Sequence, residues 1–438
     1  MVAVSFVYTA AVLFGLQDFA WDEAHYLKIA EYWYDRNPAF KELFMEPVPH
    51  SRVLNFSPLL SFLEYMSFLA FGMNLEVPKL LYATFLPLLL VAVYKLVSEV
   101  DSREVALTAC GFLLTNATIL FWSTRMYTDI PAVALMSLGF YFVVKAGKSD
   151  ARRNYVAAGV AFGLGAMMRV PSVAIAGAAV LLYMVLNRKL SPNILFMSTI
   201  VLPAIPWLVY SQMEFENAFD GLETYFVQFA VQPKEPAKSS ASIAAGVDVV
   251  WMLMAAIGVF VIGRAADIRV VAAAVAFVVF LATPFGDVRY AIPAIVFGSM
   301  VAAAGAYRIS NGSPLRITLL IVIVFLVLLN IPTLAQRQMD NLFCANGSAV
   351  VKIAERLRST ENDSIVLAES YWPQIEFYSK RDTYALVGEA PHLDMLARDG
   401  RTGYIITLSE NPNIKYLNGF RLLETFTDNC RTLYLYGR

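Results

Sequence analysis

Charge is scarce in this chain. Only 16% of its 438 residues are charged, and the formal net charge is −1. Proteins that bind nucleic acid present a basic surface, so nucleic acid is not expected as a partner. Hydrophobic residues make up 58% of the chain, which is too many for an ordinary soluble enzyme. The composition therefore predicts a polytopic α-helical membrane protein.

Cysteine is also rare. The three cysteines, Cys110, Cys344 and Cys430, lack the spacing of a metal site. Cys344 and Cys430 lie in the polar C-terminal region, where they either form a disulfide in an oxidising compartment or remain free thiols. That region has no glycine loop for phosphate. The start of the chain lacks the basic residues and cleavage site of a secretory signal, so the first apolar segment is predicted to be a retained span.

Apolar runs of about 20 residues, the length that a bilayer core requires, dominate the rest of the chain. They predict eleven spans, near residues 2–19, 77–97, 104–122, 129–146, 155–169, 171–187, 194–212, 246–263, 269–283, 289–306 and 315–333. The shorter run Ser57–Gly72 contains Glu64 and is predicted to be an interfacial helix. Arg169 and Pro171 divide one long run into two spans, because proline breaks a helix.

Basic residues are concentrated in one set of the loops that connect these spans. The set contains Lys95, Arg103, Lys145, Lys148, Arg152, Arg153, Arg188, Lys189, Arg264, Arg269, Arg308 and Arg316. Positive residues mark cytoplasmic loops, so the N-terminus is predicted to be cytoplasmic and the C-terminal region extracytoplasmic. The transmembrane domain is expected to cover residues 1–335, with outer loops at 20–56 and 214–245. The second loop is either a lid or a slack connector.

Residues 336–438 have the sequence pattern of a small soluble α/β domain. This domain is expected to have a structural role or to contact the acceptor. Predicted strands are Ser364–Ala368, Gly403–Leu408 and a closing antiparallel pair, Leu422–Phe426 with Thr432–Tyr436. Predicted helices are Val350–Arg358 and Pro373–Tyr378.

Two adjacent acids, Asp22 and Glu23, follow the first apolar segment. Acids at a membrane edge are costly to desolvate, which suggests a function. A local explanation also exists, since Asp22 suits the N-cap of a helix Glu23–Arg36 and acids are favoured in a first turn. One face of this helix is expected to lie in the interface: Tyr26, Leu27, Ile29, Ala30, Trp33 and Tyr34. The other is expected to face water: His25, Lys28, Glu31 and Asp35.

Arginines occur at the same predicted membrane edge. Arg125 precedes Asp129 by four residues, a spacing that also suits a local ion pair and helix cap. Arg289 and Tyr290 begin a span, where a snorkelling arginine and an interfacial tyrosine are common. Arg169 lies inside an apolar run, so it requires a partner or an anionic ligand. Together these residues favour a base and an anion-binding site beside lipid.

The ordered motifs resemble the GT-C superfamily of membrane glycosyltransferases, and most closely the protein O-mannosyltransferases and the aminoarabinose transferase of lipid A. Asp22-Glu23 resembles the acidic motif of the first outer loop. Three later segments resemble the interfacial Pro-Leu-x-x-x-Leu, the Arg-x-x-x-Asp and the Arg-Tyr-x-x-Pro motifs: Pro58–Leu63, Arg125–Asp129 and Arg289–Pro293. The usual His-Pro-Pro or Arg-Pro-Pro opening is replaced by Asn55-Phe56-Ser57-Pro58, which alters the contacts expected there.

The resemblance implies sugar transfer from a polyprenyl- or dolichyl-phosphate donor, such as dolichyl phosphate mannose, to a hydroxyl of a protein, glycan or lipid. The reaction would occur at the outer face of the plasma membrane, with inversion. Asp22 would act as base, while Glu23 or Asp129 orients the acceptor or holds Asp22. The donor phosphate would be bound by Arg52, Arg125, Arg169, Arg289 and Tyr290. The resemblance implies no required cofactor, although a divalent cation held by the three acids is an open alternative.

Two other functions remain compatible with the sequence. A transporter or lipid flippase would place polar residues at mid-membrane and often contains repeats, whereas the charges here lie at one face. A non-catalytic membrane scaffold, with an outer domain that binds a partner, leaves the arginines and paired acids unexplained.

Overall fold

The chain forms two compact units. One contains residues 1–13, 54–60 and 79–336, and the other contains residues 14–53, 61–78 and 337–438. The computed structural model describes residues 1–15, 19, 21–35, 58–149, 151–187, 199–219, 255–256, 258–259, 262, 267–282, 288–309, 348–360, 364–368, 371–381, 383–385, 402–410, 419–428 and 431–438. Most of the predicted span 246–263, all of the predicted span 315–333, most of the loop 214–245, and Cys344 and Cys430 lie outside these residues.

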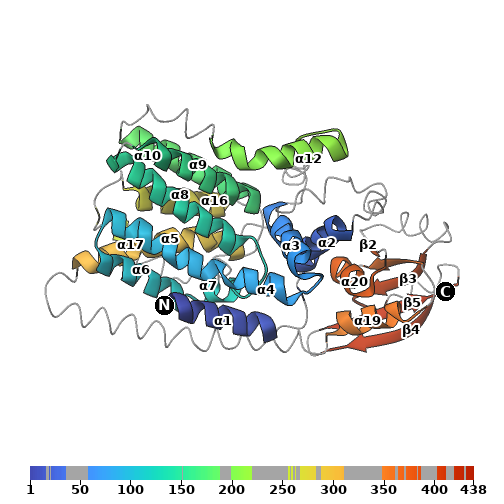
Figure 1. Cartoon of the computed structure of the whole chain (residues 1–438). Helices are drawn as coiled ribbons and strands as arrows, with labels where there is room; N and C mark the ends of the chain where they lie inside the picture. Colours follow the sequence, from blue (N-terminus) through green and yellow to red (C-terminus); the bar gives the residue numbers. More distant parts are fainter. Residues whose placement is uncertain are drawn as a thin grey trace. The chain divides into compact units, whose positions relative to one another are not determined.

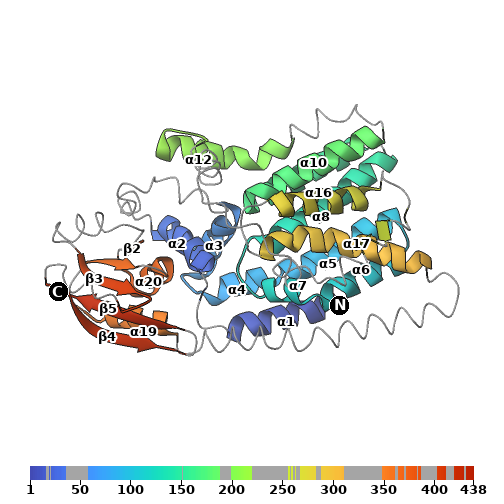
Figure 2. The same ribbon diagram turned by 180° about the vertical axis from the view of Figure 1, so that it is seen from behind.

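The first unit is a helical bundle. Its helices are α1 (Val2–Gly15), α4 (Glu76–Ala83), α5 (Phe85–Val100), α6 (Arg103–Thr115), α7 (Ala117–Trp122), α8 (Asp129–Ser149), α9 (Arg152–Met168), α10 (Val170–Leu186), η3 (Leu202–Ala204), α12 (Ile205–Phe215), α16 (Ile268–Ala282), η4 (Val288–Ala291) and α17 (Ile292–Ile309). Figure 1 shows α8, α9 and α10 side by side, and Figure 2 shows the same arrangement from behind. Helix α5 packs against α6 and α8, and α17 packs against α6 and α16.

Three helices among the described residues are long and apolar enough to cross a membrane: Glu76–Val100, Asp129–Ser149 and Arg289–Arg308. Shorter apolar helices in this part of the chain are Val2–Gly15, Pro58–Phe71, Val170–Leu186, Thr199–Met213 and Ile268–Leu281. The predicted total of eleven spans therefore stays a prediction.

Two polar residues interrupt the helices of the bundle. Arg169 lies between α9 and α10 in an extended conformation, with φ −157° and ψ 114°. This confirms the predicted helix break before Pro171. The predicted single segment 104–122 is also divided, because the Asn116 side chain accepts a hydrogen bond from the Ile119 N–H (3.0 Å) and caps α7.

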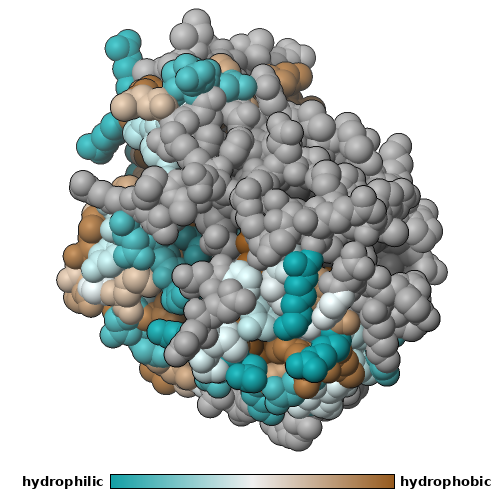
Figure 3. Space-filling model, turned by 90° about the vertical axis from the view of Figure 1, so that its right-hand side faces the viewer, coloured by the Kyte–Doolittle hydropathy of each residue, from teal (hydrophilic) through white to brown (hydrophobic). Residues whose placement is uncertain are grey.

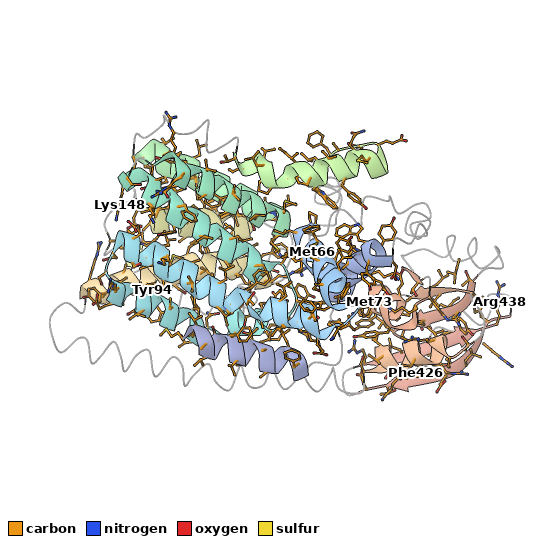
Figure 4. All side chains as sticks on the ribbon, viewed as in Figure 1. Met66, Met73, Tyr94, Lys148, Phe426 and Arg438 are labelled. Carbon is orange, nitrogen blue, oxygen red and sulfur yellow. The ribbon has the colours of Figure 1, made fainter. Side chains whose placement is uncertain are left out.

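A buried ion network joins α16 to the connection between α5 and α6. The Arg269 side chain, 1% exposed, donates to both Asp267 oxygens (3.0 and 2.7 Å) and to Asp101 (3.1 Å). A more exposed pair joins Lys148 of α8 to Glu99 of α5 at 3.2 Å. Figure 4 labels Lys148 and Tyr94 near the same end of the bundle.

The second unit contains a five-stranded sheet of order β2-β1-β3-β5-β4. Its elements are α19 (Ala349–Arg358), β1 (Ile365–Ala368), α20 (Trp372–Ser379), β2 (Thr383–Ala385), β3 (Thr402–Thr407), β4 (Arg421–Thr427) and β5 (Thr432–Gly437). Strand β1 is parallel to β2 and β3, whereas β5 is antiparallel to β3 and β4. Strands and helices form at each segment for which the sequence predicted them in this region, and the structure adds β2, which was not predicted.

Both faces of this sheet bury apolar side chains, as the apolar runs of β1 and β3 predict. Val366, Ile406, Leu435 and Phe426 (labelled in Figure 4) pack in one core with α19 and α20. The other face holds the cluster Leu367, Ile405, Phe420 and Tyr436. On the face displayed in Figure 3, hydrophilic described residues (teal) lie among hydrophobic ones (brown).

Helices α2 (Trp21–Asp35) and α3 (Pro58–Phe71) pack beside each other in the second unit. The ring of Trp33 lies 6.1 Å from that of Tyr65, and Tyr34 lies 6.2 Å from Phe68. The prediction that His25 and Glu31 face water is wrong, since both are buried. Helix α20 of the C-terminal domain covers this side of α2 and supplies a cation for Glu31.

Candidate active site

The centre of the candidate site in the first unit is an ion pair between Arg169 and Asp129. The Arg169 Nη1 atom lies 2.5 Å from the Asp129 Oδ1 atom, and the Asp129 side chain is only 1% exposed. Asp129 is the first residue of α8, and Arg169 occupies the break between α9 and α10. The break allows the arginine to leave the helical path, and the carboxylate offsets the cost of burying its charge.

Arg289 and Tyr290 reach the same site from η4. The Arg169 guanidinium lies 4.5 Å from the centre of the Tyr290 ring. The Arg289 guanidinium lies 5.6 Å from the Tyr290 ring and 5.1 Å from the Tyr127 ring. Cation–π attraction at these distances stabilises both guanidinium groups beside the tyrosine rings. The structure thus brings together four of the residues that the sequence selected.

Tyr127 is a site residue that sequence reasoning missed. Its backbone carbonyl accepts a hydrogen bond from the hydroxyl of buried Tyr82, and its ring contacts Trp122 with centroids 5.0 Å apart. Tyr127 lies inside the motif that begins with Arg125, which could have drawn attention to it. Arg125 itself is half-buried in the connection between α7 and α8.

Three helix starts converge on this cluster. Helix α8 begins at Asp129, α10 begins at Val170, and η4 with α17 begins at Val288. The first turns of helices carry unpaired N–H groups and a partial positive charge, which favours anions. The cluster also contains one carboxylate and two guanidinium groups, so its net charge is positive. The cluster is therefore suited to an anion such as a phosphate.

The acidic motif lies in the second unit. Asp22 and Glu23 occupy the first turn of α2, and both are buried. Because α2 begins at Trp21, Asp22 belongs to the first turn and not to the N-cap position. Acids in this turn are stabilised by the helix dipole, which accounts for their placement but not for their burial.

Glu64 of α3 is a third buried carboxyl near this motif, and it was missed as a site residue. Neither of its oxygens has a hydrogen-bond partner among the residues that the structure describes. Burial and then the charge of Glu23 raise the pKa of Glu64 well above its ordinary value. The pKa of His25 is lowered to about 3 by burial, so this imidazole is neutral at physiological pH. An acid in the middle of an apolar run was the available signal for Glu64.

The candidate residues form two sets that lie in different units. The second unit contains Asp22, Glu23 and Glu64, and the first unit contains Asp129, Arg169, Arg289 and Tyr290. Arg52 lies outside the described residues. Within the described ranges, no group of three or more His, Cys, Asp or Glu side chains is placed to hold a metal ion. The roles of these residues stay predictions.

A family model described as dolichyl-phosphate-mannose-protein mannosyltransferase matches residues 55–210. No curated protein matches the chain significantly. Among solved structures, ArnT from Cupriavidus metallidurans bound to undecaprenyl phosphate is similar with a TM-score of 0.70 and 13% identity, over 99% of this chain and 97% of that chain.

Two further structures have related folds. Archaeal oligosaccharyltransferase AglB from Archaeoglobus fulgidus, in complex with an inhibitory peptide and a dolichol-phosphate, gives a TM-score of 0.59 at 12% identity, over 93% of this chain and 69% of that chain. Arabinofuranosyltransferase AftD from Mycobacteria gives a TM-score of 0.60 at 11% identity, over 100% of this chain and 39% of that chain. The resemblance to the GT-C superfamily is thus confirmed, and the chain has the fold of these membrane glycosyltransferases.

Proposed function

We propose that the protein transfers a sugar from a polyprenyl- or dolichyl-phosphate donor to an acceptor hydroxyl at the outer face of a cell membrane. The observation that carries this proposal is the buried Asp129–Arg169 pair beside Arg289 and Tyr290. Two structures with this fold hold undecaprenyl phosphate and a dolichol-phosphate, which supports a lipid phosphate as the anion.

The arginine cluster suits the departing phosphate. When the bond to the sugar breaks, negative charge grows on the phosphate oxygens, and cations already in position stabilise that charge. Arginine presents a planar set of N–H donors that matches phosphate oxygens. In this proposal Arg169 and Arg289 bind the phosphate, Tyr290 orients both guanidinium groups, and Asp129 holds Arg169. Arg125 and Arg52 are further phosphate ligands.

The acidic motif suits the acceptor. Asp22 takes the proton of the acceptor hydroxyl while the oxygen attacks the anomeric carbon. The bond between that carbon and the phosphate oxygen breaks, and its electron pair leaves with the phosphate monoester. A single displacement of this kind inverts the configuration at the anomeric carbon. Glu23 holds Asp22 or the acceptor hydroxyl in position.

The test is release of polyprenyl phosphate by the purified protein in lipid. A panel of lipid-phosphate sugars is supplied with an extract of host envelope as acceptor. Asp22→Asn is expected to lower kcat by about 10²–10⁴-fold, the usual contribution of a positioned base. Asp35→Asn, an exposed acid at the other end of α2, is the matched control.

The outcomes separate the proposed function from its alternatives. Release by the wild type and by Asp35→Asn, but not by Asp22→Asn, supports the transferase and the role of Asp22. The linkage of the product tests inversion, and a parallel assay with a chelator tests the divalent cation. No release with any donor from a folded protein would reject the transferase and favour a transporter or a scaffold.

A further inference from the structure

Helix α20 of the C-terminal domain docks directly on the segment that carries the acidic motif. The Phe19 backbone N–H donates a hydrogen bond to the Tyr378 hydroxyl at 3.0 Å. The Phe19 ring lies edge-on to Phe377, with centroids 5.8 Å apart, and stacks on Tyr378 at 6.2 Å. The chain is thus held three residues before Asp22.

A second contact, made by charged groups, holds α2 on the C-terminal side of Asp22 and Glu23. Lys380, which ends α20, places its Nζ atom 2.5 Å from the Glu31 Oε1 atom. In the opposite direction, the Lys28 Nζ atom of α2 lies 3.5 Å from the Glu376 Oε1 atom of α20. Lys28 also lies 3.9 Å from the Glu31 Oε2 atom. Each helix therefore supplies one cation and one anion to the same contact.

Burial makes this contact specific. The Glu31 and Glu376 side chains are 10% and 5% exposed, while their partners Lys380 and Lys28 are 40% and 21% exposed, so water screens these pairs less than it screens fully exposed ion pairs. A buried carboxylate that loses its cation keeps its charge in a poorly solvated place. A change of sign at Lys380 would therefore place two negative groups together and push α20 away from α2.

We propose that α20 is a positioning element for the acidic motif, acting through the Glu31–Lys380 and Lys28–Glu376 pairs. This inference rests on the proposed function, in which Asp22 is the base. The two attachment points, at Phe19 and at Glu31, bracket Asp22 and Glu23 along the chain, so both acids lie in a segment whose two ends are held by α20. A displacement of about 1 Å at a reacting group can lower a rate by about 10²-fold.

The experiment exchanges the charges of one pair. Lys380→Glu and Glu31→Lys are made singly and together, with Lys352→Glu, at an exposed position of α19, as the control. Each single variant is expected to lower kcat at least tenfold while the KM for the lipid donor stays within about twofold. The double variant restores an attraction between positions 31 and 380 but loses the Lys28–Glu31 contact, so it is expected to be at least about threefold more active than either single variant without reaching the wild-type kcat.

Amide hydrogen exchange over residues 21–35 provides a readout that does not depend on turnover. Exchange is expected to rise in each single variant and to return in the double variant. Failure of the double variant to recover in either readout would overturn the proposal. An active wild type whose single variants keep their kcat would overturn the positioning role alone. A wild type without transferase activity would overturn the proposed function, and the positioning role with it.

Discussion

Arg169 and Asp129 form an ion pair that joins a helix break to a helix start. The arginine stands between α9 and α10, and the aspartate opens α8. Residues 40 positions apart are thus connected inside an apolar bundle, where an arginine without a partner would be strongly unfavourable. The pair also directs the guanidinium toward Tyr290 and the start of α17. This relationship leads to the first prediction.

Arg169→Met is expected to destabilise the protein by about 3–5 kcal/mol, because it removes the cation that is paired with the buried Asp129 carboxylate at 2.5 Å. The double variant Arg169→Met with Asp129→Asn is expected to recover part of this loss. Unfolding in detergent measures both, with Arg153→Met, at the exposed other end of α9, as the control. A loss below about 1 kcal/mol for the single variant would mean that the pair is not needed for stability.

Arg289→Lys is expected to weaken binding of the lipid donor more than it slows the chemical step. Lysine keeps the charge but loses the planar set of N–H donors and changes the cation–π contacts with Tyr127 and Tyr290. We expect the KM for the lipid donor to rise about tenfold, equivalent to about 1.4 kcal/mol. Arg308→Lys near the other end of α17 is the control. An unchanged KM would exclude Arg289 from phosphate binding.

Glu64→Gln is expected to change how stability depends on pH. The pKa of Glu64 is raised in the folded protein, so the folded state holds its proton more tightly than the unfolded state. Wild-type stability should therefore fall as pH rises from the ordinary value of 4.5 toward the raised pKa. The glutamine variant lacks this loss and should be the more stable form at higher pH.

Thermal unfolding between pH 4 and pH 8 measures this difference. Glu76→Gln, which changes an exposed acid of α4, should run parallel to the wild type. Curves for Glu64→Gln that also run parallel would show that Glu64 does not titrate in this range.

Arg269→Met is expected to destabilise the bundle far more than Lys148→Met. Arg269 is buried and bound to Asp267 and Asp101, so its loss should cost about 3–5 kcal/mol. Lys148 pairs with Glu99 at the surface, and exposed pairs contribute about 0–1 kcal/mol. Unfolding of the two variants side by side tests the difference, and equal losses would contradict it.

Local patterns in the sequence predicted most of the described elements. The break at Arg169 followed from proline chemistry, and helix α3 followed from an apolar run, while its interfacial location stays a prediction. The division at Asn116 was not predicted, because its side chain competes for backbone N–H groups inside a run that reads as continuously apolar.

The error at His25 and Glu31 has a different origin. Both residues occupy the polar side of an amphipathic helix, and such a side normally faces water. Here the cation for Glu31 comes from Lys380, 349 positions later in the chain. No local pattern contains that information. The partners of Arg169 and Arg289 could not be identified from local sequence patterns either. That a buried arginine needs a partner was predictable.

The separation between α2 and α20 has a consequence for biosynthesis. Chains emerge from the ribosome at about 5–20 residues per second, so α2 waits on the order of 20–70 s before α20 is made. Strand β5, between β3 and β4 in the sheet, is made later still. During that interval Phe19 and Glu31 lack the ring and ammonium partners of α20. The contacts that hold α2 against α20 therefore form only after the membrane-spanning segments have been synthesised.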